Sequence, residues 1–280
     1  NGFTIPFFYY DQFIKENKLE EAIFEMMNDQ RFVHDPAYRR ERLTMMRERI
    51  QKGKLNDKLR AEVLRRIATG FAGKGMFVRS TSNSEDLPNF SGAGLYDTVP
   101  NVKGDEQLVE AIKTVWSSLW KFEAYEARER ANVDHSKIFM AVLIQEAINS
   151  ESSGVMITTD PYDRDNRGSI YISAKRGLGI KVVEGKKIAE QILYRTRGNS
   201  VQVLTRSGED SLLTFDEKGG VREIPITGER AVLTDEVIRR LVRAADQIKR
   251  TFRSRDQDIE WAYMKGQIYI IQSRPYISGS

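Results

Sequence analysis

The chain has 280 residues, 40% of them hydrophobic, and no cysteine. This length allows one large domain or two lobes with a real core. The lack of cysteine excludes a disulfide framework and a thiolate zinc site, and it agrees with a cytoplasmic location. The 44 Lys and Arg residues nearly balance the 40 Asp and Glu residues, and the signs are interleaved, so we expect no nucleic-acid partner. No apolar run approaches the roughly 18–20 residues of a membrane span, and no membrane association is expected.

The first third of the chain is predicted to be helical. Apolar residues recur at helical spacing over residues 11–28. Pro36 is placed to open a second helix toward residue 50, and Asn56 is placed to cap a third helix through residue 67. Glycines then break the pattern before a predicted strand at residues 76–80.

The segment 77–99, FVRSTSNSEDLPNFSGAGLYDTV, carries more chemical information than any other. Glycine lets backbone N–H groups approach a ligand closely, hydroxyls add donors, and Arg79 adds a bidentate fork, so the segment is suited to hold phosphate. The alternative is an ordinary surface loop built from Asn, Ser, Pro and Gly. The presence of Arg79, Glu85 and Asp86 beside the glycines favours the phosphate site.

The rest of the chain changes from helical to strand periodicity. A long amphipathic helix is predicted over residues 105–130, and a last helix over residues 234–252 is capped by Thr234. Helices followed by a mostly antiparallel sheet with packed helices predict an α+β fold in two lobes. The predicted strands are 138–148, 154–159, 169–174, 188–195, 200–205, 211–215 and 220–224, followed by a closing hairpin.

The closing hairpin, DIEWAYMKGQIYIIQSRP, is the second strong signal. A two-residue loop would pair Glu260 with Ile271 and turn Gln272 to the opposite face. A three-residue loop with Gly266 in the left-handed conformation keeps Glu260, Gln272 and Arg274 on one face. Such a face carries the oxygen ligands and the planar cation that a Mg²⁺–triphosphate group requires. The alternative is an ordinary cross-strand ion pair between Glu260 and Arg274.

Weaker candidates lie between these two segments. The apolar strand that ends in Gln145-Glu146 could present its backbone to an adenine edge, although most such strands are only core. The pair Gly177-x-Gly179 follows a strand, and an isolated Gly-x-Gly is usually a turn. Neither His34 nor His135 has a second histidine at metal-ligand spacing, so a histidine-based metal site is not expected.

Taken in this order, these elements resemble the nucleotide-binding domain of the phosphoenolpyruvate-utilising dikinases. The group comprises phosphoenolpyruvate synthase, pyruvate phosphate dikinase, rifampin phosphotransferase and the glucan, water dikinases. The resemblance implies an ATP-grasp fold, in which two lobes close over ATP and Mg²⁺. The matching stretches are 79–101, 142–148, 153–161, 176–185 and 258–275.

The resemblance also implies roles for individual residues. Arg79 would contact the phosphates of ATP, and Arg274 would stabilise the transferring phosphoryl group. Glu260 and Gln272 would hold Mg²⁺. The remaining implied nucleotide contacts are Ser80, Ser82, Ser84 and Glu85 in the adjoining wall, Ser91, Gly92 and Gly94 over the triphosphate, and Gln145, Glu146 and Ile148 around adenine and ribose.

The chain departs from the family pattern at two places. The family opens with a Gly-Gly-Lys segment whose lysine reaches ATP, and this chain begins past that point. The family's Gly-Leu-Gly-Glu ends here in Ile180. We therefore expect one incomplete ATP-grasp domain, inactive or impaired by itself, with approximate lobes 1–143 and 144–278. The phosphohistidine domain of the family has no counterpart in this length.

The function expected from the sequence is a MgATP-binding domain of a dikinase. Phosphate would pass from ATP to a catalytic histidine on another domain, and then to an acceptor such as pyruvate. The first alternative is a non-catalytic nucleotide-binding module of the same fold. A second is an interaction domain without nucleotide, which leaves the coincidence of Arg79, Glu260 and Arg274 unexplained.

Overall fold

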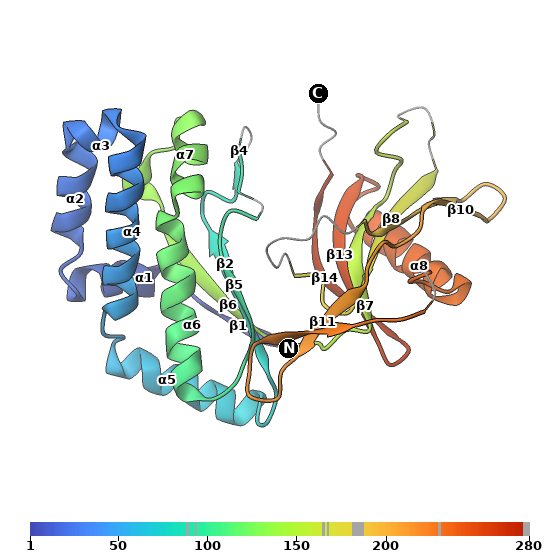
Figure 1. Cartoon of the computed structure of the whole chain (residues 1–280), viewed down its shortest axis with the longest axis horizontal. Helices are drawn as coiled ribbons and strands as arrows, with labels where there is room; N and C mark the ends of the chain where they lie inside the picture. Colours follow the sequence, from blue (N-terminus) through green and yellow to red (C-terminus); the bar gives the residue numbers. More distant parts are fainter. Residues whose placement is uncertain are drawn as a thin grey trace. The chain divides into compact units, whose positions relative to one another are not determined.

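The computed structural model divides the chain into two compact units (Figure 1). The first unit comprises Asn1–Ala147 with Asp216–Gly220, and the second comprises Ile148–Phe215 with Val221–Ser280. The α+β class expected from the sequence is confirmed. The structure describes residues 1–87, 90–92, 94–163, 166, 168–180, 188–228 and 231–276.

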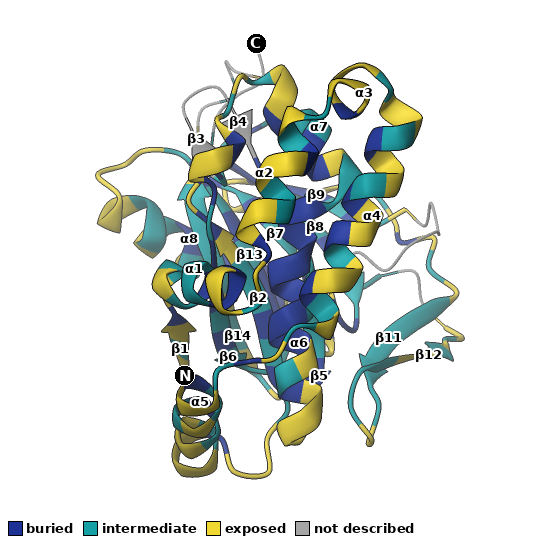
Figure 2. Ribbon diagram, turned by 90° about the vertical axis from the view of Figure 1, so that its left-hand side faces the viewer, coloured by how far each residue is buried: buried dark blue, intermediate teal, exposed yellow. Residues whose placement is uncertain are grey.

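The first unit is built on a four-stranded antiparallel sheet with the strand order β1-β6-β2-β5. Its helices lie on one side of this sheet in Figure 1. Helix α6 packs directly on β2, β5 and β6, and α4 packs on α6; the dark blue of α6 in Figure 2 marks its burial. The elements are β1 (Gly2–Ile5), α1 (Phe7–Glu16), α2 (Glu20–Asn28), α3 (Gln30–His34), α4 (Pro36–Lys52), α5 (Asp57–Gly70), β2 (Met76–Ser82), β3 (Asp86–Leu87), β4 (Phe90–Ser91), β5 (Thr98–Val102), α6 (Asp105–Ser117), the 3₁₀ turn η1 (Ser118–Trp120), α7 (Phe122–Arg130), the 3₁₀ turn η2 (His135–Lys137) and β6 (Met140–Glu146).

Two predicted helices of this unit are each divided in the structure. The expected helix 11–28 ends at Glu16, because Lys18 adopts a left-handed conformation with φ 53°. The Asn17 side chain stabilises this break by donating to the carbonyl of Phe13 at 2.9 Å and to that of Lys54 at 3.1 Å. The expected helix 105–130 is interrupted by η1, which buries Trp120 so that its indole donates to the Tyr10 hydroxyl at 3.0 Å.

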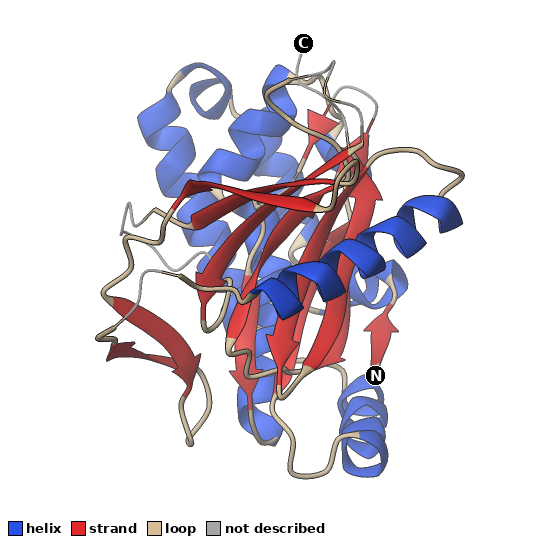
Figure 3. Cartoon of the chain, turned by 90° about the vertical axis from the view of Figure 1, so that its right-hand side faces the viewer, coloured by secondary structure: helices blue, strands red, loops and turns tan. Residues whose placement is uncertain are grey.

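The second unit contains a six-stranded antiparallel sheet with the order β10-β9-β8-β7-β13-β14. Helix α8 lies across one face of this sheet (Figure 3) and shares a core with Ile172, Ile259 and Trp261. The side chain of Thr234 caps α8, as predicted, by accepting from the N–H of Val237 at 3.4 Å. The elements are β7 (Ser152–Ile157), β8 (Ser169–Arg176), β9 (Glu190–Arg195), β10 (Ser200–Thr205), β11 (Ser211–Phe215), β12 (Val221–Pro225), α8 (Asp235–Thr251), β13 (Gln257–Met264) and β14 (Gln267–Pro275).

The turn of the β11–β12 hairpin belongs to the first unit. Asn101 holds this turn, because its side-chain amide donates to the carbonyls of Asp216 at 2.8 Å and Gly220 at 2.7 Å. The backbone N–H of Gly220 returns a bond to the carbonyl of Asn101 at 3.0 Å. A short turn far along the sequence is thereby packed on the end of β5.

None of the helices in the described parts of the chain is long and apolar enough to cross a bilayer.

Candidate functional site

Arg79 lies on the face of the first sheet that is turned away from the helical core. Alternate residues of β2 point to opposite faces, and its neighbours Met76 and Val78 are buried in the core. The register places Arg79 opposite Leu143, and Phe77 opposite Gln145. Directly opposed residues share a face, so Arg79 and Gln145 lie on the same face of this sheet.

Two other predicted nucleotide contacts lie elsewhere on this sheet. Ser80 pairs with Val142, which is fully buried, and so points toward the helices. Glu146 follows Gln145 and forms an ion pair with Lys74, whose Nζ lies 2.7 Å from Glu146 Oε1. This ammonium lowers the pKa of the Glu146 carboxyl. Strand alternation therefore separates Ser80 and Glu146 from the Arg79 face. Ile148 belongs to the second unit.

The loop that follows β2 is held by its own hydroxyls and carboxylate. Ser84 is 1% exposed, and its hydroxyl lies 2.9 Å from that of Ser82. One carboxylate oxygen of Glu85 accepts from the N–H of Ser82 at 3.1 Å, while the N–H of Glu85 donates to the carbonyl of Ser82 at 3.2 Å. The structure therefore uses Ser82 and Ser84 inside the loop, where they fix its conformation.

Gly92 closes this loop from the other side. Its N–H donates to the carbonyl of Glu85 at 2.7 Å, and a Cβ at this position would lie 3.1 Å from Glu85 Cα and 3.3 Å from the Tyr96 ring. A side chain here would force these neighbours to move, so glycine permits the close approach. Gly94 has φ 74°. Ser91 pairs with Asp86 through the backbone; its side chain and Ala93 lie outside the described residues.

The closing hairpin has a two-residue turn and a bulge. Lys265 and Gly266 both have positive φ, 48° and 77°, as a tight hairpin turn with the twist of the strands requires. The register runs regularly to Trp261, and a β-bulge then shifts it so that Glu260 faces Gln272. The expectation that a two-residue loop would pair Glu260 with Ile271 is therefore wrong. The extra residue of the bulge produces the alignment that was expected only from a longer loop.

This register also brings in a residue that sequence reasoning missed, Asp258. It lies directly opposite Arg274, and one of its carboxylate oxygens, Oδ2, accepts from Arg274 Nε at 2.9 Å and from Nη2 at 2.7 Å. Because Asp258 precedes Glu260 by two positions, the two carboxylates share a face of β13. The same spacing in the sequence could have identified it.

The hairpin face fits a hard divalent cation. The second carboxylate oxygen of Asp258, Oδ1, is buried and has no hydrogen-bond partner among the residues that the structure describes. Glu260 and Gln272 carry further side-chain oxygens on the same face. Within the described ranges, no group of three or more His, Cys, Asp or Glu side chains is placed to hold a metal. This donor set suits Mg²⁺, which typically takes one or two carboxylates together with substrate phosphates and water.

The glycine pair at 177 and 179 has a packing role. The hydroxyls of Ser150 and Ser153 donate to the carbonyl of Gly177 at 2.8 Å and 2.6 Å. Gly177 has φ 67°, and a Cβ there would collide with the carbonyl oxygen of Leu213. The close approach that this glycine allows is thus to the backbone of β11, as expected for a structural turn. Ile180 is half-buried.

The hairpin face carries two carboxylates, an amide and a guanidinium. Arg79 lies on another strand, which leads into a Ser- and Gly-rich loop. Residues of these types are typical of proteins that bind nucleoside polyphosphates. The chain belongs to the family described as pyruvate phosphate dikinase, AMP/ATP-binding domain, which matches residues 1–279. The family resemblance drawn from the sequence is confirmed, and this chain is an ATP-binding domain of the phosphoenolpyruvate-utilising dikinases, with an ATP-grasp-like fold.

Several curated proteins are similar to this chain. A probable phosphoenolpyruvate synthase of Pyrococcus horikoshii is 32% identical over 277 residues, which cover 92% of this chain and 33% of the relative. The phosphoenolpyruvate synthase of Pyrococcus furiosus is 37% identical over 213 residues, 71% of this chain and 25% of the relative. A rifampicin phosphotransferase of Streptomyces sviceus is 32% identical over 233 residues, 82% of this chain and 26% of the relative. The chain thus spans a third or less of each of these relatives.

Proposed function

We propose that this domain binds MgATP and supplies phosphate to a catalytic histidine on another domain of the same protein, which passes it to an acceptor such as pyruvate. The observation that carries this proposal is the bulged register of the β13–β14 hairpin, which aligns Asp258, Glu260, Gln272 and Arg274 on one face. Phosphoryl transfer needs mainly positioning and charge neutralisation, and these residue types supply both.

In this proposal Arg274 neutralises charge on the transferring phosphoryl group. A guanidinium is a rigid planar fork whose direction matters for phosphate. Asp258 fixes that direction through two bonds, at 2.9 Å and 2.7 Å, to a single oxygen. The nucleotide therefore meets an arginine whose orientation is already set, so that less side-chain entropy is lost on binding.

Glu260 and Gln272 are proposed to hold Mg²⁺, with Asp258 Oδ1 as a further oxygen ligand. When bound, the cation would offset the negative charge of the phosphates. Glu260 and Gln272 face each other across the two strands, so the backbone ladder fixes their separation. Glu260 and Gln272 would thus hold their side-chain oxygens near each other before the nucleotide binds.

Arg79 is proposed to contact the phosphates of ATP, and Gln145 to contribute to the adenine-ribose pocket. Both side chains lie on the face of the first sheet that does not pack on the helices. Ser82, Ser84 and Glu85 are proposed to shape the adjoining wall. Ser91, Gly92 and Gly94 are proposed to lie over the triphosphate. Ser80 and Glu146 are weaker candidates, because neither shares the Arg79 face. Ile148 is still proposed to contact adenine and ribose.

The histidine and the acceptor are proposed to lie in other parts of the full protein. The region that matches this chain covers only 33% of one relative and 25% of another. Most of each relative therefore lies outside the matched region. Their names differ in acceptor, phosphoenolpyruvate synthase in one case and rifampicin phosphotransferase in another. The nucleotide domain is what they share with this chain, so the acceptor is not set by it.

A second candidate function is nucleotide binding without transfer. It is favoured by Ile180, which stands where the resemblance to the dikinases implies glutamate. Loss of one carboxylate near the phosphates would impair transfer more than binding.

Isothermal titration calorimetry with ATP and Mg²⁺ tests the proposal. We expect the chain to bind ATP and the Arg274→Gln variant to bind it at least roughly tenfold more weakly, as for loss of a charge-assisted contact. Arg239→Gln, at an exposed position of α8, is the matched control and should bind like the parent. Absence of binding heat with the parent chain, or equal affinity of the parent and Arg274→Gln, would overturn the assignment.

A further inference from the structure

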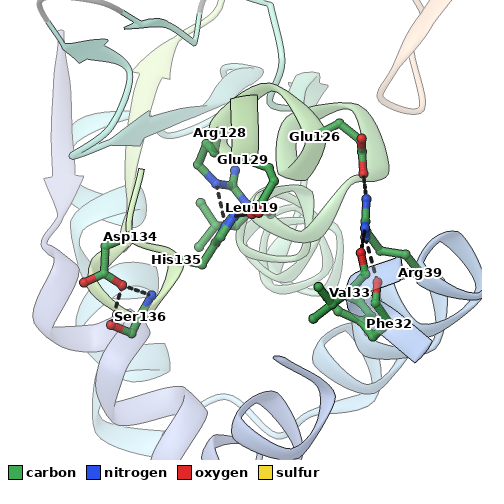
Figure 4. A network of polar contacts seen from close by, with 10 residues as sticks. All are labelled: Phe32, Val33, Arg39, Leu119, Glu126, Arg128, Glu129, Asp134, His135 and Ser136. Atoms are coloured by element: carbon green, nitrogen blue, oxygen red, sulfur yellow. Dashed lines mark hydrogen bonds and ion pairs between the residues drawn. The ribbon is translucent and has the colours of Figure 1, made fainter. Parts of the chain in front are cut away.

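Arg128, on α7, is a buried cation that the proposed chemistry does not use. This residue is 1% exposed. Its Nη2 donates to the carbonyl of Leu119 at 2.7 Å and its Nε to His135 Nδ1 at 3.3 Å (Figure 4). Its Nη1 donates to the Tyr96 hydroxyl at 3.2 Å. A buried guanidinium is costly unless its donors are satisfied. Its place in the fold therefore calls for a specific role.

The Tyr96 hydroxyl links Arg128 to the loop after β2. An arginine can only donate, so the Tyr96 oxygen accepts from it, and the hydroxyl hydrogen of Tyr96 is left to donate. The hydroxyl of Ser84 lies 3.2 Å from that oxygen, and Ser84 is in turn 2.9 Å from Ser82. A continuous polar chain thus runs from Arg128 through Tyr96 to the loop residues 82–85.

Tyr96 also supports the opposite side of the same loop. The space that a Cβ at Gly92 would occupy lies 3.3 Å from the Tyr96 ring and 3.1 Å from Glu85 Cα. The N–H of Gly92 bonds to the carbonyl of Glu85 at 2.7 Å. One tyrosine therefore contacts both segments that are proposed to surround the phosphates, with its hydroxyl at Ser84 and its ring at Gly92.

His135 holds Arg128 from the other end. Because Arg128 Nε donates to Nδ1, the ring proton of neutral His135 is assigned to Nε2, which lies 3.0 Å from a carboxylate oxygen of Glu129. The ring stacks on Tyr125 with centroids 4.0 Å apart. Both neighbours limit the freedom of His135, and the histidine in turn limits that of Arg128.

We infer that Arg128 is a positioning residue for nucleotide binding: through the Tyr96 hydroxyl it sets the conformation of residues 82–85 and 92 from inside the protein. This inference rests on the proposed function, and it assigns a role to a residue that would touch neither ATP nor metal. Buried side-chain networks of this kind are strong when every member is satisfied. Loss of one hydroxyl in the middle should loosen the loop while the helical core stays folded.

The test compares two buried tyrosines of the first unit. Tyr96→Phe removes the oxygen that joins Arg128 to Ser84 and keeps the ring at Gly92. Tyr10→Phe is the matched control, because the Tyr10 hydroxyl accepts from the Trp120 indole at 3.0 Å and does not join Arg128 to Ser84. We expect Tyr96→Phe to raise the Kd for MgATP roughly tenfold and to speed amide hydrogen exchange at residues 82–85. Tyr10→Phe should change neither.

Equal ATP affinity of Tyr96→Phe and the parent would overturn the inference, and so would equal exchange of residues 82–85 in both. If the parent chain bound no ATP, the proposed function would fail instead, and the exchange measurement would still decide whether Tyr96 controls the loop. A double-variant cycle adds the link to Arg128. Arg128→Lys keeps the charge and loses the fork, so its effect on Kd should be non-additive with Tyr96→Phe. Additive effects would contradict a path through the tyrosine.

Discussion

Single residues of the hairpin differ in how far their sequence context reveals them. Glu260, Gln272 and Arg274 are recognisable because their types suit a metal–phosphate group. Asp258 gains its importance from the partner across the strand, Arg274, to which it offers one oxygen at 2.9 Å and 2.7 Å. The spacing of Asp258 and Glu260 in the sequence places both on one face of a strand, whereas the pairing of Asp258 with Arg274 depends on the register.

A pH-dependent stability is predicted for His135. Burial and the charge of Arg128 lower the pKa of this imidazole below its ordinary value, against a smaller opposing effect of Glu129. The unfolded chain therefore binds a proton more readily than the folded chain as the pH falls through about 6.5. The free energy of unfolding should decrease from pH 7.5 to pH 5.5, because this contribution is present above the unfolded pKa and is lost as the imidazole becomes protonated.

Urea unfolding at several pH values measures this effect. In His135→Gln, whose amide oxygen can still accept from Arg128, the decline between pH 7.5 and 5.5 should be smaller than in the parent. His34→Gln, at an exposed position, is the control and should leave the decline unchanged. The same slope in His135→Gln and the parent would show that His135 does not titrate in the way its surroundings imply.

At the scale of elements, the hairpin shows why register is difficult to predict. The turn residues Lys265 and Gly266 indicate a tight loop, and a tight loop alone would have separated Glu260 from Gln272. The bulge between Trp261 and Glu260 restores their pairing. A bulge depends on packing over both faces of the sheet, and the two-residue periodicity of the sequence contains no direct signal for it.

The helices show the same limit in another form. Helical spacing correctly located α4, α5 and α8, together with the caps Asn56 and Thr234. It did not reveal the breaks near Lys18 and at Ser118–Trp120, because apolar spacing continues across both. Each break is stabilised by a contact distant in sequence, such as Asn17 with Lys54. Long-range contacts of this kind override local propensity.

Gly177 allows an element-scale prediction about the attachment of β11 to the end of β8. Both Gly177 and Gly198 have positive φ, 67° and 87°, but only at Gly177 does a Cβ meet backbone, the Leu213 carbonyl. Gly198→Ala should lower the free energy of unfolding by about 1–2 kcal/mol through backbone strain alone. Gly177→Ala should lower it by roughly 3 kcal/mol or more, because a collision is added.

Equilibrium urea unfolding of the two variants separates these contributions. The difference between them reports the close approach of Gly177 to β11, since the conformational strain is common to both. Equal losses of stability would mean that the backbone contact at Leu213 relaxes without cost.

For the molecule as a whole, the sequence predicted the α+β class and the family, because motifs at both ends of the chain could be recognised in order. It also indicated two lobes, though not that Asp216–Gly220 would pack with the first unit through Asn101. The hydrogen bonds that link Arg128 through Tyr96 to Ser84 could not be predicted from the sequence either. The residue types of Tyr96 and Arg128 do not indicate this contact, and only the fold buries them together. Recognisable motifs thus reveal the chemistry, while the contacts that support it require the structure.

We propose that this domain delivers phosphate from ATP to a histidine elsewhere in its protein. The most direct measurement is to incubate the full-length protein with labelled ATP and Mg²⁺ and to assay acid-labile, base-stable phosphate on the protein. We predict such phosphohistidine in the parent, a strong reduction in Arg274→Gln, and no change in Arg239→Gln. ATP binding without any acid-labile phosphoprotein would contradict the claim and would leave this domain as a nucleotide-binding module.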